Sequence, residues 1–313
     1  MARTRYAPDR GLTARMTLTM FFLGLVFAGF VAALVGILTA AHASSAAIVF
    51  FPILLGLGLG IGSFYYSDRI AMSAAGAQEV TPQQAPELHG TIDRICALAD
   101  MPKPRVAIAP ASMPNAFATG RNSKKAVVVV TDGLLKRLDQ DELEGVLAHE
   151  MSHVAHKDVA VMTIASFLAI IAGLLVRFAF YSELFGGGGR RNNNNNQQAF
   201  PIILVIMAVS IVVYAVSFLL IRLLSRYREL AADRSGALLT GQPSKLASAL
   251  QKVSGDIAKI PTRDLRSAEP LNAFFFAPAL SSKGASLATI FSTHPSLERR
   301  LQQLAKISQQ LGK

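Results

Sequence analysis

The sequence predicts an α+β membrane protein with about four transmembrane helices and a mainly helical polar domain that contains a small β-sheet. Composition is the first observation, because the 313-residue chain is 51% hydrophobic and only 16% charged. Second, four of its segments are apolar over the length of about 20 residues that a bilayer-crossing helix needs. Third, the polar segments between and after them contain both helix-like and strand-like periodicity.

The apolar segments come in two pairs, which predict two transmembrane hairpins. The first pair, 16–41 and 46–66, is too long and too closely spaced to be a cleaved signal peptide. The second pair, 159–176 and 199–221, flanks the low-complexity stretch "GGGGRRNNNNNQQ". That composition cannot build a core and predicts a flexible loop at 182–198. The predicted order is a basic tail (1–15), a hairpin (16–66), a polar segment (67–158), a second hairpin (159–225) and a second polar segment (226–313).

The net charge of +11 is concentrated beside the predicted spans. Basic residues at span ends are retained on the cytoplasmic side and contact anionic lipid. They predict that the N-terminus and both polar segments face the cytoplasm. No aromatic residues are interleaved with the basic ones, so we expect no nucleic-acid binding. The single cysteine, Cys96, excludes an internal disulfide and a cysteine-rich zinc site. The flanking basic residues are Arg3, Arg5, Arg10 and Arg15 before the first span, and Arg222, Arg226 and Arg228 after the fourth.

The first polar segment contains the elements of a small α+β domain. A helix at about 84–99 precedes a strand at 105–109, and "NAFATG" and "KAVVVV" flank the turn signal "GRNSKK" as in a β-hairpin. Asp139 and Glu142 have the spacing of a capping box, which predicts that a helix starts there. Further helices are expected near 244–257 and from about 296.

The predicted helix after Asp139 carries the sequence "HEMSH". His149 and His153 are four residues apart and therefore project from one helix face. Two imidazoles placed this way can bind one tetrahedral zinc, and Glu150 can then accept a proton from water at the open position. Because the pattern fixes only three positions, a polar helix face that matches by chance is the alternative.

A catalytic zinc needs a third protein ligand, and the sequence offers three candidates. His156 lies about 10 Å further along the helix axis than His149, which is too far. Asp158 would have to bend back past the helix end. Glu229, in "RELAAD", is separated from the motif by two predicted crossings and so lies on the same side of the membrane. Asp233, one turn later, could accept the outer N–H of a ligand histidine. A solvated polar face is the alternative for Glu229 and Asp233.

Four motifs, "PNAFATG", "HEMSHVAHKD", "SRYRELAADRSGA" and "STHPSLERR", together resemble the HtpX-type membrane zinc metalloproteases, gluzincins related to the CAAX prenyl proteases. The resemblance covers nearly the whole chain. It implies a zincin-like catalytic domain with one Zn²⁺ bound by His149, His153 and Glu229, and with Glu150 as the base. It also implies a multi-pass protein of the bacterial plasma membrane with a cytoplasmic active site, which cleaves misfolded membrane proteins in quality control and stress response.

Two further residues are candidates for the reaction. His294, in "THPS", could donate to the developing oxyanion, or could be a capping or core residue ahead of a helix. Asn115 could hold the substrate backbone if its strand lies at a sheet edge, or could complete a turn after Pro114. A CAAX-type prenyl endoprotease and a non-catalytic zinc-binding scaffold are the competing functions. Four spans leave little room for a lipid chamber, and Glu150 argues against a purely structural site. The oligomeric state is left open.

Overall fold

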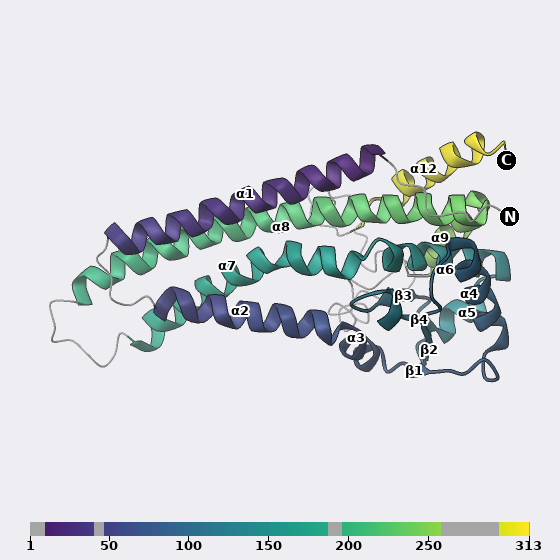
Figure 1. Cartoon of the computed structure of the whole chain (residues 1–313), viewed down its shortest axis with the longest axis horizontal. Coiled ribbons are helices and arrows are strands. Elements are labelled where there is room, and N and C mark those ends of the chain that lie inside the picture. The colour runs from purple at the N-terminus through teal and green to yellow at the C-terminus, as the bar shows by residue number, and fades with distance from the viewer. Residues whose placement is uncertain (1–9, 41–46, 187–195, 258–293, 313) are drawn as a thin grey trace. The chain divides into compact units, whose positions relative to one another are not determined.

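The computed structural model describes residues 10–40, 47–186, 196–257 and 294–312 (Figure 1). The chain forms two compact units. The first comprises Met1–Met16, Phe64–Val161 and Ser225–Lys313, and the second comprises Thr17–Ser63 and Met162–Leu224. Each unit therefore brings together segments that are distant in the sequence.

The second unit consists of long apolar helices. Among the described residues three stretches are long and apolar enough to cross a membrane: Arg10–Ile37 of α1 (Arg10–Ala40), Asp158–Arg177 of α7 (Asp158–Gly186) and Pro201–Thr240 of α8 (Asn196–Thr240). Helix α2 (Ala47–Tyr65) adds the shorter apolar stretch Ile53–Tyr65. Large apolar side chains such as those of Phe21, Leu54 and Val212 are exposed on these helices, as expected for contact with lipid. The prediction of a membrane protein with several spans is confirmed.

Helix α8 differs from the sequence expectation because it is a single helix of 45 residues. It runs without interruption from the fourth predicted span into the "RELAAD" segment, so the predicted boundary at 225/226 lies inside a helix. Helices also extend into the predicted linker 182–198, since α7 continues to Gly186 and α8 begins at Asn196. Residues 187–195 lie outside the described part of the chain. Helix α1 likewise begins at Arg10, inside the predicted basic tail.

The first unit contains a four-stranded mixed sheet, in agreement with the predicted small β-sheet. Its strands are β1 (Gln78–Glu79), β2 (Arg105–Ala109), β3 (Ala116–Thr119) and β4 (Val127–Thr131), in the order β1-β2-β4-β3. Strands β2 and β4 are parallel, whereas β3 pairs antiparallel with β4 as the predicted hairpin requires. Strand β3 is therefore an edge of the sheet.

Helices cover this sheet and enclose two clusters of buried apolar side chains among the described residues. The helices are α3 (Ser67–Ala75), α4 (Pro86–Ala99), α5 (Asp132–Arg137), α6 (Gln140–Ala155), α9 (Pro243–Ile257) and α12 (Leu297–Gln310). Ile92 of α4, Leu147 of α6, Leu246 of α9 and Leu304 of α12 are buried together in the larger cluster, and Ala71 of α3 belongs to the smaller one. The pairing of α9 with α12 and α6 thus joins the two halves of the sequence.

The start of α6 is the predicted capping box. Asp139 accepts from the backbone N–H of Glu142, and the Glu142 side chain accepts from the backbone N–H of Asp139. Glu142 is also bonded to Ser248 and Lys252 of α9. These contacts fix both the beginning and the rotation of the helix that carries the "HEMSH" motif.

Candidate metal centre

Helices α6 and α8 bring His149, His153 and Glu229 to one place. One potential ligand atom from each lies within 4.8 Å of the others. The two histidine Nε2 atoms are 3.2 Å apart. The Glu229 carboxylate lies 3.5 Å from Nε2 of His153 and 3.8 Å from Nε2 of His149. Within the described ranges, this is the group of three His, Cys, Asp or Glu residues that could hold a metal ion.

The outer nitrogen of each histidine faces a carboxylate. Nδ1 of His149 lies 2.9 Å from Asp233, and Nδ1 of His153 lies 2.5 Å from Asp158. A ring nitrogen that faces a carboxylate carries the proton, so each Nε2 presents a lone pair. Two lone pairs and a carboxylate can then converge on one point, an arrangement that favours a bound cation. Two nitrogens and one oxygen with a position left open form the donor set of a catalytic zinc site.

The protonation equilibria also reflect the negative charge around this point. Burial disfavours the imidazolium of His153, but the hydrogen bond to Asp158 and the nearby Glu229 raise its pKa to about 9. Burial lowers the pKa of His149 and outweighs the opposing effect of Asp233. The site attracts positive charge, and a metal ion or a proton can supply it.

Asp158 is a competing ligand candidate from the sequence. The structure places its carboxylate at Nδ1 of His153, on the side of the ring away from the other ligand atoms. Helix α6 ends at Ala155 and His156 is its C-cap. Lys157 adopts the left-handed conformation with φ of 56°, and this turn brings Asp158 back towards the preceding helix. Arg228 of α8 binds Asp158 at 2.6 Å. This Arg228–Asp158–His153 chain was not predicted from the sequence, because no local pattern indicates a turn at Lys157.

Asp233 has a second partner that was not predicted from the sequence either. The buried guanidinium of Arg300, on α12, donates from Nε and Nη2 to the two carboxylate oxygens at 2.7 and 2.6 Å. Such a two-point contact fixes the orientation of a carboxylate as well as its charge. Arg300 belongs to the "STHPSLERR" motif, and this motif is the feature of the sequence that could have indicated a role for Arg300. The contact with Arg300 holds the Asp233 carboxylate in the position where it faces Nδ1 of His149.

Glu150 lies next to the ligands and is buried, with 5% of its surface exposed. Its Oε2 accepts a hydrogen bond from the backbone N–H of Ala118 in strand β3 at 3.1 Å. Burial raises the pKa of Glu150 to about 8, and the charge of Glu229 contributes in the same direction. A carboxylate in this setting can hold a proton near neutral pH, as a general base that later acts as an acid must do.

The two remaining candidates are both buried. Nδ1 of His294 lies 3.1 Å from Oε2 of Glu229. The cap of α12 is Ser296, so the capping alternative for His294 is wrong. Asn115 extends the β3–β4 pairing by one residue: its backbone N–H donates to Oγ1 of Thr131 at 2.8 Å, and its carbonyl accepts from the backbone N–H of Thr131 at 3.0 Å.

The distance between α6 and α8 depends on Gly236. A Cβ at this position would lie 2.9 Å from the backbone nitrogen of His149 and 3.1 Å from its Cα. Backbone atoms cannot rotate away from such a contact. We therefore expect Gly236→Ala to separate the helices that carry the ligands, to weaken metal binding, and to lower the free energy of unfolding by about 1–3 kcal/mol.

Metal content and thermal unfolding of purified protein test this expectation. Gly255→Ala in α9 is the matched control, because a Cβ there would meet no atom within 4 Å. Alanine is the better helix former, so the control should keep its metal and be unchanged or slightly more stable. Equal behaviour of the two variants would show that the close approach at Gly236 is unimportant.

A family described as "Peptidase family M48" matches residues 82–308. The chain is 57% identical over 310 residues to "Protease HtpX homolog 1" of Streptomyces coelicolor, which covers 99% of this chain and 97% of the relative. It is 51% identical to "Protease HtpX homolog" of Moorella thermoacetica, and the match covers 99% of this chain and 98% of that relative. A similar fold occurs in the crystal structure of S. mikatae Ste24p, with a TM-score of 0.52, 18% identity, and coverage of 95% of this chain and 66% of that one.

Proposed function

The chain belongs to peptidase family M48 and is a metalloprotease, and from this premise we propose that it is a zinc-dependent endopeptidase that cleaves misfolded or damaged membrane proteins. The observation that carries the proposal is the convergence of two histidine lone pairs and the Glu229 carboxylate beside the buried Glu150. A structural zinc site is usually closed by four protein ligands and has no need of a base.

His149, His153 and Glu229 would hold the zinc ion, and Asp233 would orient His149. When bound, zinc supplies Lewis acidity that lowers the pKa of water towards about 7. Glu150 accepts the proton of the attacking water on a carboxylate oxygen and delivers it to the leaving amine. The Ala118 N–H fixes the orientation of that carboxylate. General acid–base transfer of this kind contributes about 10²–10⁴-fold to the rate.

The outer edge of strand β3 is suited to binding a substrate as an additional β-strand. The N–H of Ala118 points to Glu150, away from β4, and alternate residues of a strand direct their polar groups to the same side. A substrate in extended conformation can therefore add to β3 beside the base through main-chain hydrogen bonds, which tolerate many sequences. Asn115, at the start of this edge, would hold the substrate backbone.

His294 would act on the other side of the scissile bond. With Nδ1 directed at Glu229, its proton is shared with that carboxylate. Donation from Nε2 to a developing oxyanion then requires a proton on both ring nitrogens. In this proposal His294 has two tasks: it orients Glu229 and stabilises the oxyanion.

Removal of the metal tests the proposed activity. We expect the full chain, purified in detergent, to cleave an unfolded membrane protein, to lose this activity in a chelator, and to regain it when zinc is added back. The metal is required because Glu150 alone is a weak base towards ordinary water. Gel analysis of the cleavage products is the measurement. Proteolysis that persists in metal-free protein would contradict the mechanism.

A prenylated CAAX peptide in the same assay tests the competing endoprotease function. Efficient cleavage of that peptide, with the unfolded membrane protein left intact, would favour a CAAX-type enzyme. Zinc binding with no cleavage of either substrate would favour the non-catalytic scaffold.

We also propose that the protein resides in the bacterial plasma membrane with its active site facing the cytoplasm. Reporter fusions after Asp68, Lys157 and Lys245 should all give a cytoplasmic signal, since an even number of crossings separates these positions. A fusion within residues 186–198 should report the outside. A cytoplasmic signal from this last fusion would mean that the second hairpin does not cross the membrane.

A further inference from the structure

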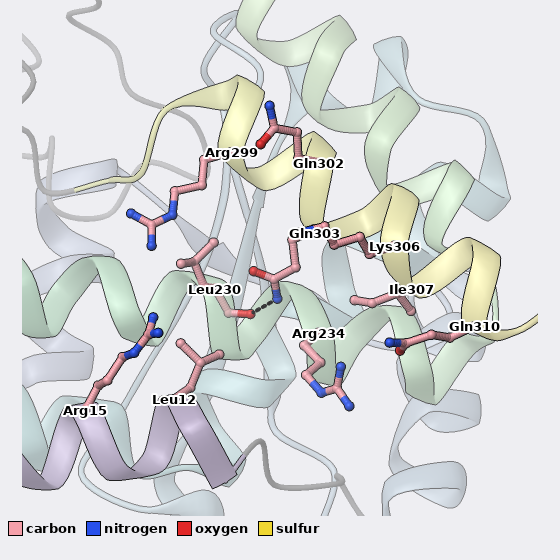
Figure 2. A pocket seen from close by; sticks show the side chains of 10 residues that line it. All are labelled: Leu12, Arg15, Leu230, Arg234, Arg299, Gln302, Gln303, Lys306, Ile307 and Gln310. Atoms are coloured by element: carbon pink, nitrogen blue, oxygen red, sulfur yellow. Dashed lines mark hydrogen bonds between the residues drawn. The ribbon is translucent and has the colours of Figure 1, made fainter.

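A small basic cavity lies where helices α1, α8 and α12 meet (Figure 2). Its volume is about 340 Å³. All of the residues that line it belong to the first compact unit. Of the described residues that line it, four are cationic, three are glutamines and three are aliphatic, with no acidic one among them. The cationic ones are Arg15, Arg234, Arg299 and Lys306.

We infer that this cavity binds the phosphate headgroup of an anionic phospholipid. Four cationic side chains line one cavity, and the charges of Arg226 and Arg299 act on each other beside it, so the lining attracts an anion. A phosphate in this cavity can accept charge-assisted hydrogen bonds from such side chains. Arginine suits this task in particular, because its planar guanidinium matches the geometry of phosphate oxygens.

The remaining lining suits the rest of a headgroup. Amides of Gln302 and Gln310 can both donate to phosphate oxygens and accept from headgroup hydroxyls. Leu12, Leu230 and Ile307 provide an apolar surface for the glycerol carbons. The volume lies at the lower end of the range of about 300–1,000 Å³ that small-molecule sites occupy. A headgroup fits such a space, whereas a folded protein segment does not.

The position of the cavity along α1 favours lipid over a soluble phosphate compound. Arg15 is directly followed by an uncharged run in the sequence, and it lies near the start of the stretch Arg10–Ile37 of α1, which is long and apolar enough to cross a membrane. The polar end of such a helix lies at the level of the headgroups. Cytoplasmic anionic lipid is attracted there at about 1 kcal/mol, or fivefold in affinity, for each Lys or Arg.

The cavity also borders the contact between α8 and α12. Gln303 donates to the carbonyl of Leu230 at 2.7 Å (Figure 2), so the two helices are joined at the cavity wall. Arg234 and Arg299 are direct sequence neighbours of Asp233 and Arg300, which pair on the side of the metal centre. A headgroup bound by both helices would hold α12 against α8. It should therefore raise the thermal stability of the protein.

Lipid binding to the full chain tests the proposal, and it can be measured whether or not the proposed proteolysis occurs. The protein is placed in nanodiscs of phosphatidylcholine, with or without phosphatidylglycerol. Native mass spectrometry counts the retained phosphatidylglycerol, and thermal unfolding gives the midpoint. The pocket variant is Arg234→Gln with Lys306→Gln. The control is Lys124→Gln with Lys125→Gln, which removes the same charge from exposed positions next to strand β4.

We expect phosphatidylglycerol to bind the wild type and the control and to raise their unfolding midpoints. The pocket variant should lose about fivefold in apparent affinity for each cation removed, and its midpoint should not rise. The single variant Lys306→Gln changes an exposed side chain, so we expect it to fold normally and to lose about fivefold in apparent affinity by itself.

Two results would overturn the proposal. An equal loss of phosphatidylglycerol from the pocket variant and the control would mean that the lipid is attracted by diffuse surface charge. If inorganic phosphate added to phosphatidylcholine nanodiscs raises the midpoint as much as phosphatidylglycerol does, the cavity binds a soluble anion and no lipid is required.

Discussion

Replacement of Glu150 by glutamine should leave a protein that binds metal normally but cleaves its substrate at least about 10²-fold more slowly. Glutamine retains the shape of the side chain and can still accept the hydrogen bond from Ala118. It cannot take up a proton. Because Glu150 is not among the three grouped ligand residues, the metal content should not change. This variant therefore separates proton transfer from metal binding.

The measurements are zinc content by mass spectrometry and the rate of cleavage of an unfolded membrane protein. Glu87→Gln is the matched control, since Glu87 is exposed on α4 and the same chemical change is made there. The control should retain full activity. A Glu150→Gln protein that contains zinc and cleaves at the normal rate would rule out Glu150 as the base.

The second large effect is expected at Glu229. Glu229→Ala removes the oxygen ligand and leaves two imidazoles whose Nε2 atoms are 3.2 Å apart. We expect metal affinity to fall sharply and proteolysis to fall with it. His156→Ala should retain zinc and much of the activity, because His156 caps the end of α6 and lies outside the ligand group. The two variants thus distinguish the third ligand from its neighbour in the sequence.

Asp233→Ala provides an intermediate case. Its carboxylate contacts His149 and Arg300 but is not itself one of the three grouped ligands. Loss of such a supporting contact typically costs about 10–100-fold in metal affinity or activity. Zinc analysis of the three variants should therefore rank them as Glu229→Ala, Asp233→Ala and His156→Ala, from the largest loss to the smallest. Zinc retained by Glu229→Ala and lost by His156→Ala would contradict the assignment of the third ligand.

The features that the sequence predicted well are those with a local physical cause. The capping box at Asp139 and Glu142 fixes where α6 starts, and the helical period then places His149 and His153 on one face. Alternation and turn residues predicted the β3–β4 hairpin. Hydropathy predicted the membrane helices, because each must bury about 20 residues in lipid whatever its neighbours are. Glu229 was predicted by counting crossings, and the structure brings it to the two histidines.

Only the tertiary structure determined what surrounds these residues. The burial of Arg300 against Asp233 joins residues that are 67 positions apart, and the contact of Ala118 with Glu150 joins two elements 32 positions apart. No local pattern encodes such pairs, since they depend on the packing of α12 on α9 and of β3 near α6. The bend at Lys157, which brings Asp158 to His153, is held by the contact with Arg228 on another helix. The sequence by itself determined the main helices, the hairpin and the candidate ligands. Which carboxylates orient the ligand histidines was decided by long-range packing, because these carboxylates and the arginines that hold them come from distant segments.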